Sequence, residues 1–122
     1  MKMVVAIIRH EKLQEVQDVL DECGVSGVTV SEVKGCGAQR GYTETYRGTN
    51  VRISLQRKVK VEAVMPDDKV DGAVDAIVGA ARTGEVGDGK IFILPVDDAV
   101  RIRSGERGNE IVQHRDPQHW GH

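Results

Sequence analysis

Apolar and polar residues are arranged in blocks that predict four strands and two helices. Residues 3–8 form a continuous apolar run that ends at Arg9, a pattern typical of a buried strand. Residues 28–35 are rich in β-branched side chains and end at a glycine, which favours a second strand. Residues 58–65 alternate between apolar and polar positions, which predicts a third strand with one buried face. The expected members of that face are Val59, Val61, Ala63 and Met65.

Two segments carry apolar residues at helical spacing. The first runs over residues 11–23 and is closed by Gly24, a residue type common just after the last helical turn. Its apolar stripe consists of Leu13, Val16, Val19, Leu20 and Cys23. The second follows Pro66, with Asp67 as the expected N-cap, and ends near Arg82. Its apolar stripe consists of Val70, Val74, Ile77, Val78 and Ala81.

The last strand signal follows the second helix. Residues 90–96 are mostly apolar, and residues 100–103 are expected to continue the chain in extended form. The order strand, helix, strand, long loop, strand, helix, strand consists of two βαβ halves. It predicts an α+β fold, a ferredoxin-like double βαβ sandwich with both helices on one face of a four-stranded antiparallel sheet. The other face would be exposed and apolar in a single copy, so we expect identical neighbours to cover it.

A long irregular stretch separates the two halves. Residues 35–57 hold several glycines and little periodicity, and connections of this length inside a compact domain usually serve a function. Side chains of the kind that anchor protein interfaces are concentrated there, namely Tyr42, Tyr46, Arg47 and Arg52. We therefore expect one domain over residues 1–112, with an interaction loop at about 37–55, and a flexible C-terminal tail over residues 113–122.

The charge balance limits the classes of partner. Seventeen Lys and Arg residues against nineteen Asp and Glu residues leave a formal net charge of −2, which gives no indication of nucleic-acid binding. Any anion-binding site would therefore depend on a local cluster of cations and N–H groups rather than on the overall charge. The 122 residues fit one domain, and no segment has the length of a secretory or membrane-spanning run. A cytoplasmic protein without direct membrane insertion is expected.

The segment between the second helix and the last strand has the glycine and lysine spacing of a phosphate-binding loop, from Gly84 to Gly89 and Lys90. In nucleotide hydrolases such a loop follows a strand, opens a helix and ends in a hydroxyl residue that holds Mg²⁺. Here a helix precedes the loop and Ile91 takes the hydroxyl position, which argues against hydrolysis. The glycines still suit an anion-binding nest, although the segment taken alone is better explained as a plain glycine-rich turn.

Two further clusters offer contacts to an anion. In an extended segment Arg101 and Arg103 project to the same face, which suits a polyphosphate and also suits a solvated sheet edge. Residues 34–41 add glycine amides and Gln39, a side chain that both donates and accepts hydrogen bonds. Neither cluster alone decides between a binding role and a structural one.

Taken in chain order, five motifs resemble the PII nitrogen-signalling proteins. They are SEVKGCGAQRG at residues 31–41, TETYRG at 43–48, KVKVEAVMPDD at 58–68, ARTGEVGDGKIFILPV at 81–96 and VRIRSGERG at 100–108. The resemblance covers roughly residues 1–112, and the combination of TGxxGDGKIF with YRG is seldom met by chance. It implies a homotrimer of ferredoxin-like subunits that binds ATP or ADP between subunits, with Mg²⁺, and senses 2-oxoglutarate. It also implies a signal transducer rather than an enzyme, whose partner is an ammonium transporter or an enzyme of nitrogen metabolism.

The resemblance implies ligand contacts for four groups of residues. The nucleotide phosphates would be wrapped by Gly87, Asp88, Gly89 and Lys90, together with Gly37, Ala38 and Gln39 at the base of the long loop. Arg101 and Arg103 would reach the same phosphates across the subunit boundary. The adenine and ribose side would be formed by Thr29, Glu62 and Val64. Lys58 and Gln39 would hold 2-oxoglutarate, with Gln39 also a ligand of a Mg²⁺ that bridges both anions.

Within the long loop, the resemblance implies that Tyr46, Arg47 and Thr49 contact the protein partner, with Arg47 entering a transporter pore. Val51 stands where many relatives carry a tyrosine that is nucleotidylated, so that modification is excluded here, while Thr49 offers a hydroxyl for phosphorylation. Ala38 stands where many relatives carry Arg or Lys. This departure predicts weaker nucleotide binding or an altered preference between ADP and ATP.

Two alternatives stay open. A PII-like paralogue would sense an adenine nucleotide with a different anion, such as bicarbonate, and Ala38 and Val51 are compatible with that function. A slow ATPase is disfavoured, because no carboxylate, His or Ser pair is placed to activate a nucleophile. The sequence does not name the protein partner.

Overall fold

The structure, a computed structural model, describes residues 1–35 and 55–112. Its strands are β1 (Lys2–Arg9), β2 (Thr29–Gly35), β3 (Gln56–Met65) and β4 (Gly89–Pro95). Its α-helices are α1 (Leu13–Glu22) and α2 (Asp67–Ala81), and short 3₁₀ helices form at η1 (His10–Lys12) and η2 (Asn109–Ile111). The strands and helices predicted from periodicity up to residue 96 are confirmed, with bounds that differ by one or two residues.

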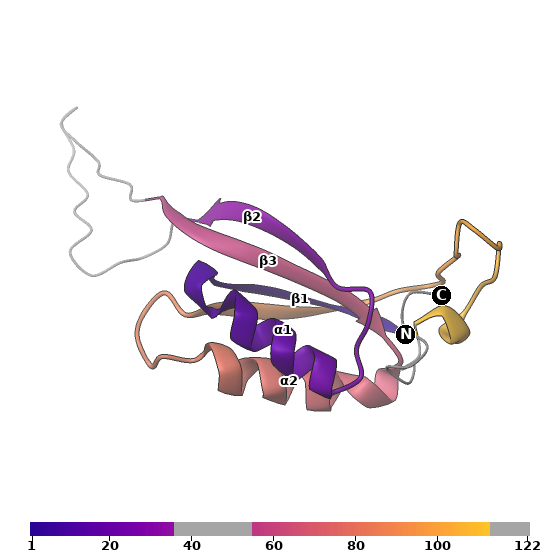
Figure 1. Ribbon diagram of the computed structural model, residues 1–122, viewed down its shortest axis with the longest axis horizontal. Coiled ribbons are helices and arrows are strands. Elements are labelled where there is room, and N and C mark those ends of the chain that lie inside the picture. Colours follow the sequence, from indigo (N-terminus) through magenta and orange to yellow (C-terminus); the bar gives the residue numbers. More distant parts are fainter. Residues whose placement is uncertain (36–54, 113–122) are drawn as a thin grey trace.

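The four strands form one sheet in the order β2-β3-β1-β4, and every neighbouring pair is antiparallel. The central position of β1 is visible in its register, because Ala6 lies opposite Val61 of β3 and opposite Ile91 of β4. Both α-helices cover the same face of the sheet (Figure 1). This is the ferredoxin-like α+β arrangement that the order of elements predicted.

The hydrophobic core lies between the helices and the sheet face that they cover. Alternate residues of β1 and β3 point into it, and these are Val4, Ala6, Ile8, Val59, Val61, Ala63 and Met65. The helices contribute Val16, Leu20, Val70, Ala73, Ile77 and Ala81. Val74 and Val78 of the predicted α2 stripe are only half-buried, on the side of the helix that faces β4. Burial of each Val, Leu or Ile contributes about 1.5–3 kcal/mol, so this layer supplies most of the stability of the fold.

The opposite face of the sheet carries no helix in the described part of the chain (Figure 1). On β1 and β4 this open face is apolar, because Val5 pairs with Phe92 and Met3 pairs with Leu94. Phe92 is 51% exposed and Leu94 is 40% exposed. On β3 the same face is mostly charged, with Lys58, Lys60 and Glu62. The apolar strip on β1 and β4 is therefore a candidate contact for another protein surface.

The predicted N-cap of the second helix is wrong. Pro66 occupies the N-cap position with φ −63° and ψ 153°, and Asp67 is already the first helical residue. The Asp67 carboxylate instead accepts a hydrogen bond from the α-amino group of Met1, with 2.7 Å between the two atoms. This hydrogen bond lowers the pKa of Asp67. The carboxylate thus joins the start of β1 to the start of α2, while its charge also suits the first turn of a helix.

Two predicted segments lie largely outside the described residues. The interaction loop at about 37–55 overlaps them only at Leu55, and the tail at 113–122 does not overlap them. Within residues 1–35 and 55–112, neither α1 nor α2 has the length and apolar character that crossing a membrane requires.

Candidate functional site

The glycine-rich loop joins α2 to β4 and lies at one end of the sheet (Figure 1). Its backbone has positive φ angles at three glycines, including 101° at Gly87 and 110° at Gly89. A Cβ atom at Gly89 would overlap the carbonyl oxygen of Ile7. Another residue type would therefore push β4 away from β1, so this glycine has a structural reason to be present.

The carboxylate of Asp88 accepts several hydrogen bonds that stabilise the glycine-rich loop. The backbone N–H groups of Thr83 and Gly84 donate to it at 2.8 Å and 2.9 Å, and the Thr83 hydroxyl donates as well. Arg9, at the end of β1, donates from Nε to Oδ1 at 3.0 Å. The hydrogen bonds from Thr83, first from its hydroxyl and then from its backbone, hold the pKa of Asp88 well below its usual range. The ionised side chain is engaged within the protein, so a ligand contact would fall to the backbone N–H of Asp88.

Two cationic side chains from neighbouring strands lie against Gly87. Arg9 of β1 and Lys58 of β3 are opposite each other in the strand register. Lys58 donates to the carbonyl oxygen of Gly87, and Arg9 donates from Nη2 to the carbonyl oxygen of Val86 at 2.9 Å. Burial lowers the pKa of Lys58, and the positive charge of Arg9 lowers it further. The negative charges of Asp88 and Glu11 already offset part of this repulsion, and a bound anion would offset more of it, so this end of the sheet suits a negatively charged ligand.

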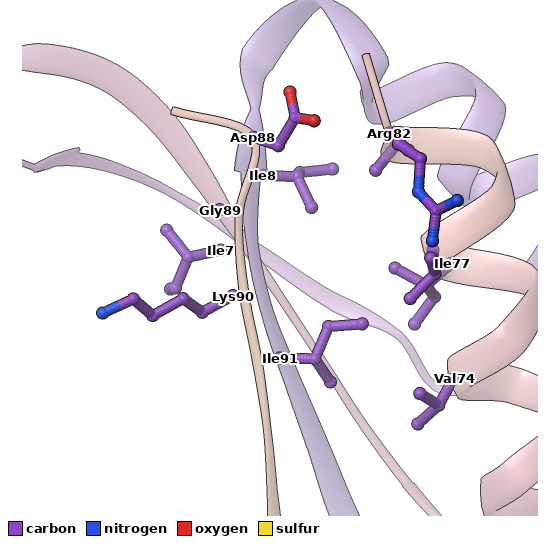
Figure 2. Close-up of a pocket in the computed structure, with 11 residues that line it drawn as sticks. Ile7, Ile8, Val74, Ile77, Arg82, Asp88, Gly89, Lys90 and Ile91 are labelled. Carbon is purple, nitrogen blue, oxygen red and sulfur yellow. The ribbon is translucent and has the colours of Figure 1, made fainter. Parts of the chain in front are cut away.

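Arg9 is a candidate that sequence reasoning missed. In the sequence it is only the charged residue that ends the first apolar run. Its place beside Lys58 and the glycine loop follows from the register of β1 against β3 and β4, which periodicity does not specify. Lys90, a predicted phosphate contact, is exposed and opposite Ile7, and Figure 2 shows both side chains pointing away from α2.

A cavity of about 330 Å³ opens between α2 and β4 (Figure 2). Its apolar lining comes from β1, α2 and β4, and consists of Ile7, Ile8, Val74, Ile77, Val78, Ala81 and Ile91. Arg82 and Asp88 lie at the end of the cavity next to the glycine loop. Of the predicted contacts that fall in the described residues, only Asp88, Gly89 and Lys90 border this cavity, so the described nucleotide contacts do not converge there.

The three residues predicted for the adenine and ribose side lie together. Thr29 of β2 pairs with Glu62 of β3, and Val64 follows two positions later on the same face of β3. All three line a cavity of about 370 Å³, and Met3 borders it from β1. The rest of the lining consists of Ser26, Gly27, Ala63, Ile111 and Val112. A cavity with an apolar wall and a few polar groups suits a planar base.

The prediction that VRIR continues as an extended strand is wrong. The N–H of Arg101 donates to the carbonyl of Glu106 at 2.8 Å, and the N–H of Gly105 donates to the carbonyl of Arg101 at 2.7 Å. Gly105 has a φ angle of 76°, which lets the chain reverse there. The segment is a tight turn, so Arg101 and Arg103 do not share a face through strand alternation. We call residues 98–108 the arginine hairpin.

The two arginines of the hairpin have different surroundings. Arg101 is 26% exposed and its Nη1 lies 2.8 Å from Oε1 of Glu106. Arg103 is exposed and makes no hydrogen bond or ion pair with other residues in the described ranges. At the base of the hairpin, Asp98 and Arg107 form a second ion pair, with 2.7 Å between Oδ2 and Nη2.

The glycine loop and the arginine hairpin lie at opposite ends of β4 (Figure 1). Gly89, at the loop end of β4, pairs with Ile8, whereas Pro95, at the hairpin end, pairs with Lys2. Seven residues of extended strand separate the two ends by roughly 20 Å. The predicted phosphate contacts that fall in the described residues are therefore divided into two sets that a single copy does not bring together. The hairpin shares its end of the sheet with the cavity at Thr29, Glu62 and Val64.

The predicted contacts in the long loop lie outside the described residues. They are Gly37, Ala38, Gln39, Tyr46, Arg47 and Thr49, together with the substituted position Val51. Among the described residues, no group of three or more His, Cys, Asp or Glu side chains is placed to hold a metal ion. The donors that the described loop offers are N–H groups and cations, which suit phosphate or carboxylate rather than a metal.

Comparison with known proteins assigns the family. Residues 1–106 match the family described as Nitrogen regulatory protein P-II. The chain is 53% identical over 112 residues to the Nitrogen regulatory protein P-II of Rhodobacter capsulatus, and 55% identical over 112 residues to that of Microchaete diplosiphon. These matches cover 92% of this chain and 100% of each relative. The chain is also 54% identical over 112 residues to the Nitrogen regulatory protein P-II 2 of Methanothermobacter thermautotrophicus, covering 92% of this chain and 97% of the relative. The resemblance carried by the five motifs is thus confirmed, and the chain belongs to the nitrogen regulatory protein P-II family.

Proposed function

We propose that the chain is a nitrogen-regulatory signal transducer that binds ATP or ADP, and 2-oxoglutarate, at the boundaries between the copies of a homotrimer. It reports the bound state through the loop at about 37–55, where Tyr46, Arg47 and Thr49 contact an ammonium transporter or an enzyme of nitrogen metabolism. The protein acts in the cytoplasm by binding its ligands and does not turn them over. Membership of the P-II family supports the regulatory role.

One observation carries the nucleotide proposal: the two sets of groups suited to phosphate lie at opposite ends of β4 (Figure 1). Gly87 and Lys90 belong to one end, and Arg101 and Arg103 belong to the other. One polyphosphate contacts both sets only if a second copy places its arginine hairpin beside the glycine loop of the first. The exposed apolar strip around Phe92 supplies a surface for such an assembly, since an oligomer buries it.

In this arrangement each copy contributes two half-sites. The half-site at the glycine loop offers backbone N–H groups and Lys90 to the phosphates. The half-site at the hairpin end offers Arg101 and Arg103 to the phosphates and the cavity at Thr29 and Glu62 to the base. This division explains why the predicted contacts are spread over the whole length of the sheet.

The second anion belongs near Lys58. Lys58 and Arg9 lie together beside Gly87, and two neighbouring cations suit a carboxylate ligand such as 2-oxoglutarate. Bound Mg²⁺ would supply a positive charge shared by the nucleotide and the 2-oxoglutarate. The Asp88 carboxylate is engaged within the loop, so Gln39 and the anions themselves would provide the oxygen ligands. Binding of either anion then favours the other.

Calorimetric titration with ATP, ADP and AMP, each with and without Mg²⁺ and 2-oxoglutarate, tests the proposal. We expect MgATP to bind without release of phosphate, and 2-oxoglutarate to bind only when MgATP is present. Sedimentation analysis of the same samples should give a trimer. If 2-oxoglutarate produced no heat in the presence of MgATP, the second anion would have to be a different one, such as bicarbonate. Steady release of phosphate would contradict the non-enzymatic role.

A further inference from the structure

The arginine hairpin contains a carboxylate that contacts Arg101, one of the predicted phosphate contacts. Glu106 lies 2.8 Å from Nη1 of Arg101 through its Oε1 atom. The Ser104 hydroxyl donates to the same oxygen at 2.8 Å, and the N–H of Glu106 lies 3.2 Å from the Ser104 hydroxyl. These contacts hold the carboxylate against the guanidinium group, so Glu106 is part of the hairpin structure.

This carboxylate is the same kind of acceptor as a phosphate oxygen. Both are anionic oxygens that take charge-assisted hydrogen bonds from a guanidinium group. In the free chain Glu106 therefore fills the place at Arg101 that a phosphate oxygen would take. Arg103 makes no hydrogen bond or ion pair among the described residues. Of the two arginines, Arg103 is therefore the one that a phosphate can contact without displacing another group.

We propose that Glu106 is an internal competitor for the nucleotide phosphates at Arg101. Arg103 makes the first contact with the incoming anion, and Arg101 contributes only by exchanging Glu106 for a phosphate oxygen. Since the carboxylate stays close to the site, it repels the ligand more strongly as the charge of the ligand rises. Glu106 then determines specificity, because it reduces the advantage of ATP over ADP. This inference rests on the proposed function, which brings nucleotide phosphates to the hairpin.

The exchange is energetically accessible because the ion pair is partly open to solvent. The Arg101 side chain is 26% exposed and the Glu106 side chain is 50% exposed. Ion pairs in such positions contribute little to stability, since water competes for both partners. A polyphosphate, with several anionic oxygens, can replace one carboxylate without disrupting the hairpin. The backbone hydrogen bond from Arg101 to the Glu106 carbonyl, at 2.8 Å, keeps the turn closed during the exchange.

The test is the substitution Glu106→Gln, which removes the charge and keeps the size and one acceptor oxygen. The matched control is Asp98→Asn, which removes a charge from the ion pair with Arg107 at the base of the same hairpin. Binding of ATP and of ADP is measured by calorimetry on the assembled protein at about 0.05 M and about 0.5 M salt. We expect Glu106→Gln to bind ATP about threefold to tenfold more tightly than the wild type at low salt. The gain should be smaller for ADP and should shrink at high salt, whereas Asp98→Asn should change either affinity by less than about twofold.

The outcomes separate this inference from the proposed function. A wild-type protein that binds neither ATP nor ADP overturns both. A wild-type protein that binds them, with a Glu106→Gln variant that binds no more tightly, overturns the competitor role alone and indicates that Glu106 only supports the hairpin. If Glu106→Gln raised the affinities for ATP and ADP equally, and the increase did not depend on salt, charge competition would also be overturned. Glu106→Asp keeps the charge and should retain wild-type affinity, and thermal melting of each variant checks that it is folded.

Discussion

Arg9 and Asp88 form an ion pair, with 3.0 Å between Nε and Oδ1, that joins the end of β1 to the loop before β4. Their side chains are only 21% and 24% exposed, whereas those of the pair between Arg57 and Glu32 are 65% and 79% exposed. Arg9 also donates to the Val86 carbonyl at 2.9 Å, so its guanidinium group contacts the loop at two points. Arg9 therefore positions the backbone of the glycine loop relative to the sheet.

The substitution Arg9→Gln should weaken ATP binding by roughly tenfold, because the loop loses charge-assisted hydrogen bonds that orient its N–H groups. Calorimetric titration checks the affinity. Arg57→Gln is the matched control, since it removes an equally charged side chain from an exposed pair, and it should bind ATP as the wild type does. Equal loss of affinity in the two variants would show that only overall charge matters.

Gly89→Ala and Gly72→Ala should change stability in opposite directions. A Cβ at position 89 would overlap the Ile7 carbonyl oxygen, and the φ angle of 110° is itself unfavourable for alanine. We expect the free energy of unfolding to fall by at least about 2 kcal/mol. Gly72 lies exposed within α2 and a Cβ there meets no atom within 4 Å, so alanine should raise the free energy of unfolding by about 0.5–1 kcal/mol. Urea denaturation measures both, and a neutral Gly89→Ala variant would contradict the loop geometry.

Asp88 should make the fold sensitive to acid. Its pKa in the folded protein lies below the value in the unfolded chain, so its ionised form stabilises the fold above the ordinary Asp pKa of about 4. That contribution is lost as the pH falls through and below this value. Between about pH 5 and about pH 3, the urea midpoint should fall more steeply for the wild type than for Asp88→Asn. Asp75→Asn, at an exposed site on α2, should keep the wild-type slope, and identical slopes in all three proteins would contradict the role of Asp88.

Lys58 should matter more for binding of an anion than for stability of the free protein. Burial and the charge of Arg9 lower its pKa, so the folded state disfavours the charged form. Lys58→Met removes this penalty and also the hydrogen bond to the Gly87 carbonyl, so the free energy of unfolding of the free protein should change by less than about 1 kcal/mol. Binding of 2-oxoglutarate in the presence of MgATP should weaken by roughly tenfold or more, because a carboxylate loses its cation. Lys60→Met, on the same face of β3, should leave 2-oxoglutarate binding unchanged, and equal losses would place the anion elsewhere.

The elements of the core could be predicted from the sequence because their patterns are local. Val59 and Val61 lie two residues apart on β3 and both face the helices, which is the pattern that strict alternation indicates. The same reasoning failed at residues 100–103, where the alternation has no core to pack against. Ile102 is 99% exposed, and the turn at Gly105 decides the conformation instead.

The candidate site was only partly accessible to sequence reasoning. The glycine loop is one continuous segment, so its residue types made it a candidate anion site, which the resemblance to the family then favoured over a plain turn. Arg9 and Lys58 are far apart in sequence and meet only through the register of β1 against β3, which no local pattern encodes. The separation of Gly87 from Arg103 also follows from the course of β4, since the loop precedes the strand and the hairpin follows it.

The most direct test of the proposed nucleotide site is complementation between two defective chains, Lys90→Glu and Arg103→Glu. Each variant alone should fail to bind ATP, because each changes one half-site in every copy of the assembly. When the two chains are expressed together and purified as mixed oligomers, an intact Lys90 on one copy can meet an intact Arg103 on the next. We predict that the mixed oligomers regain a fraction of the wild-type ATP sites in calorimetric titration. Mixed oligomers that bind no more ATP than either parent would contradict a site shared between copies.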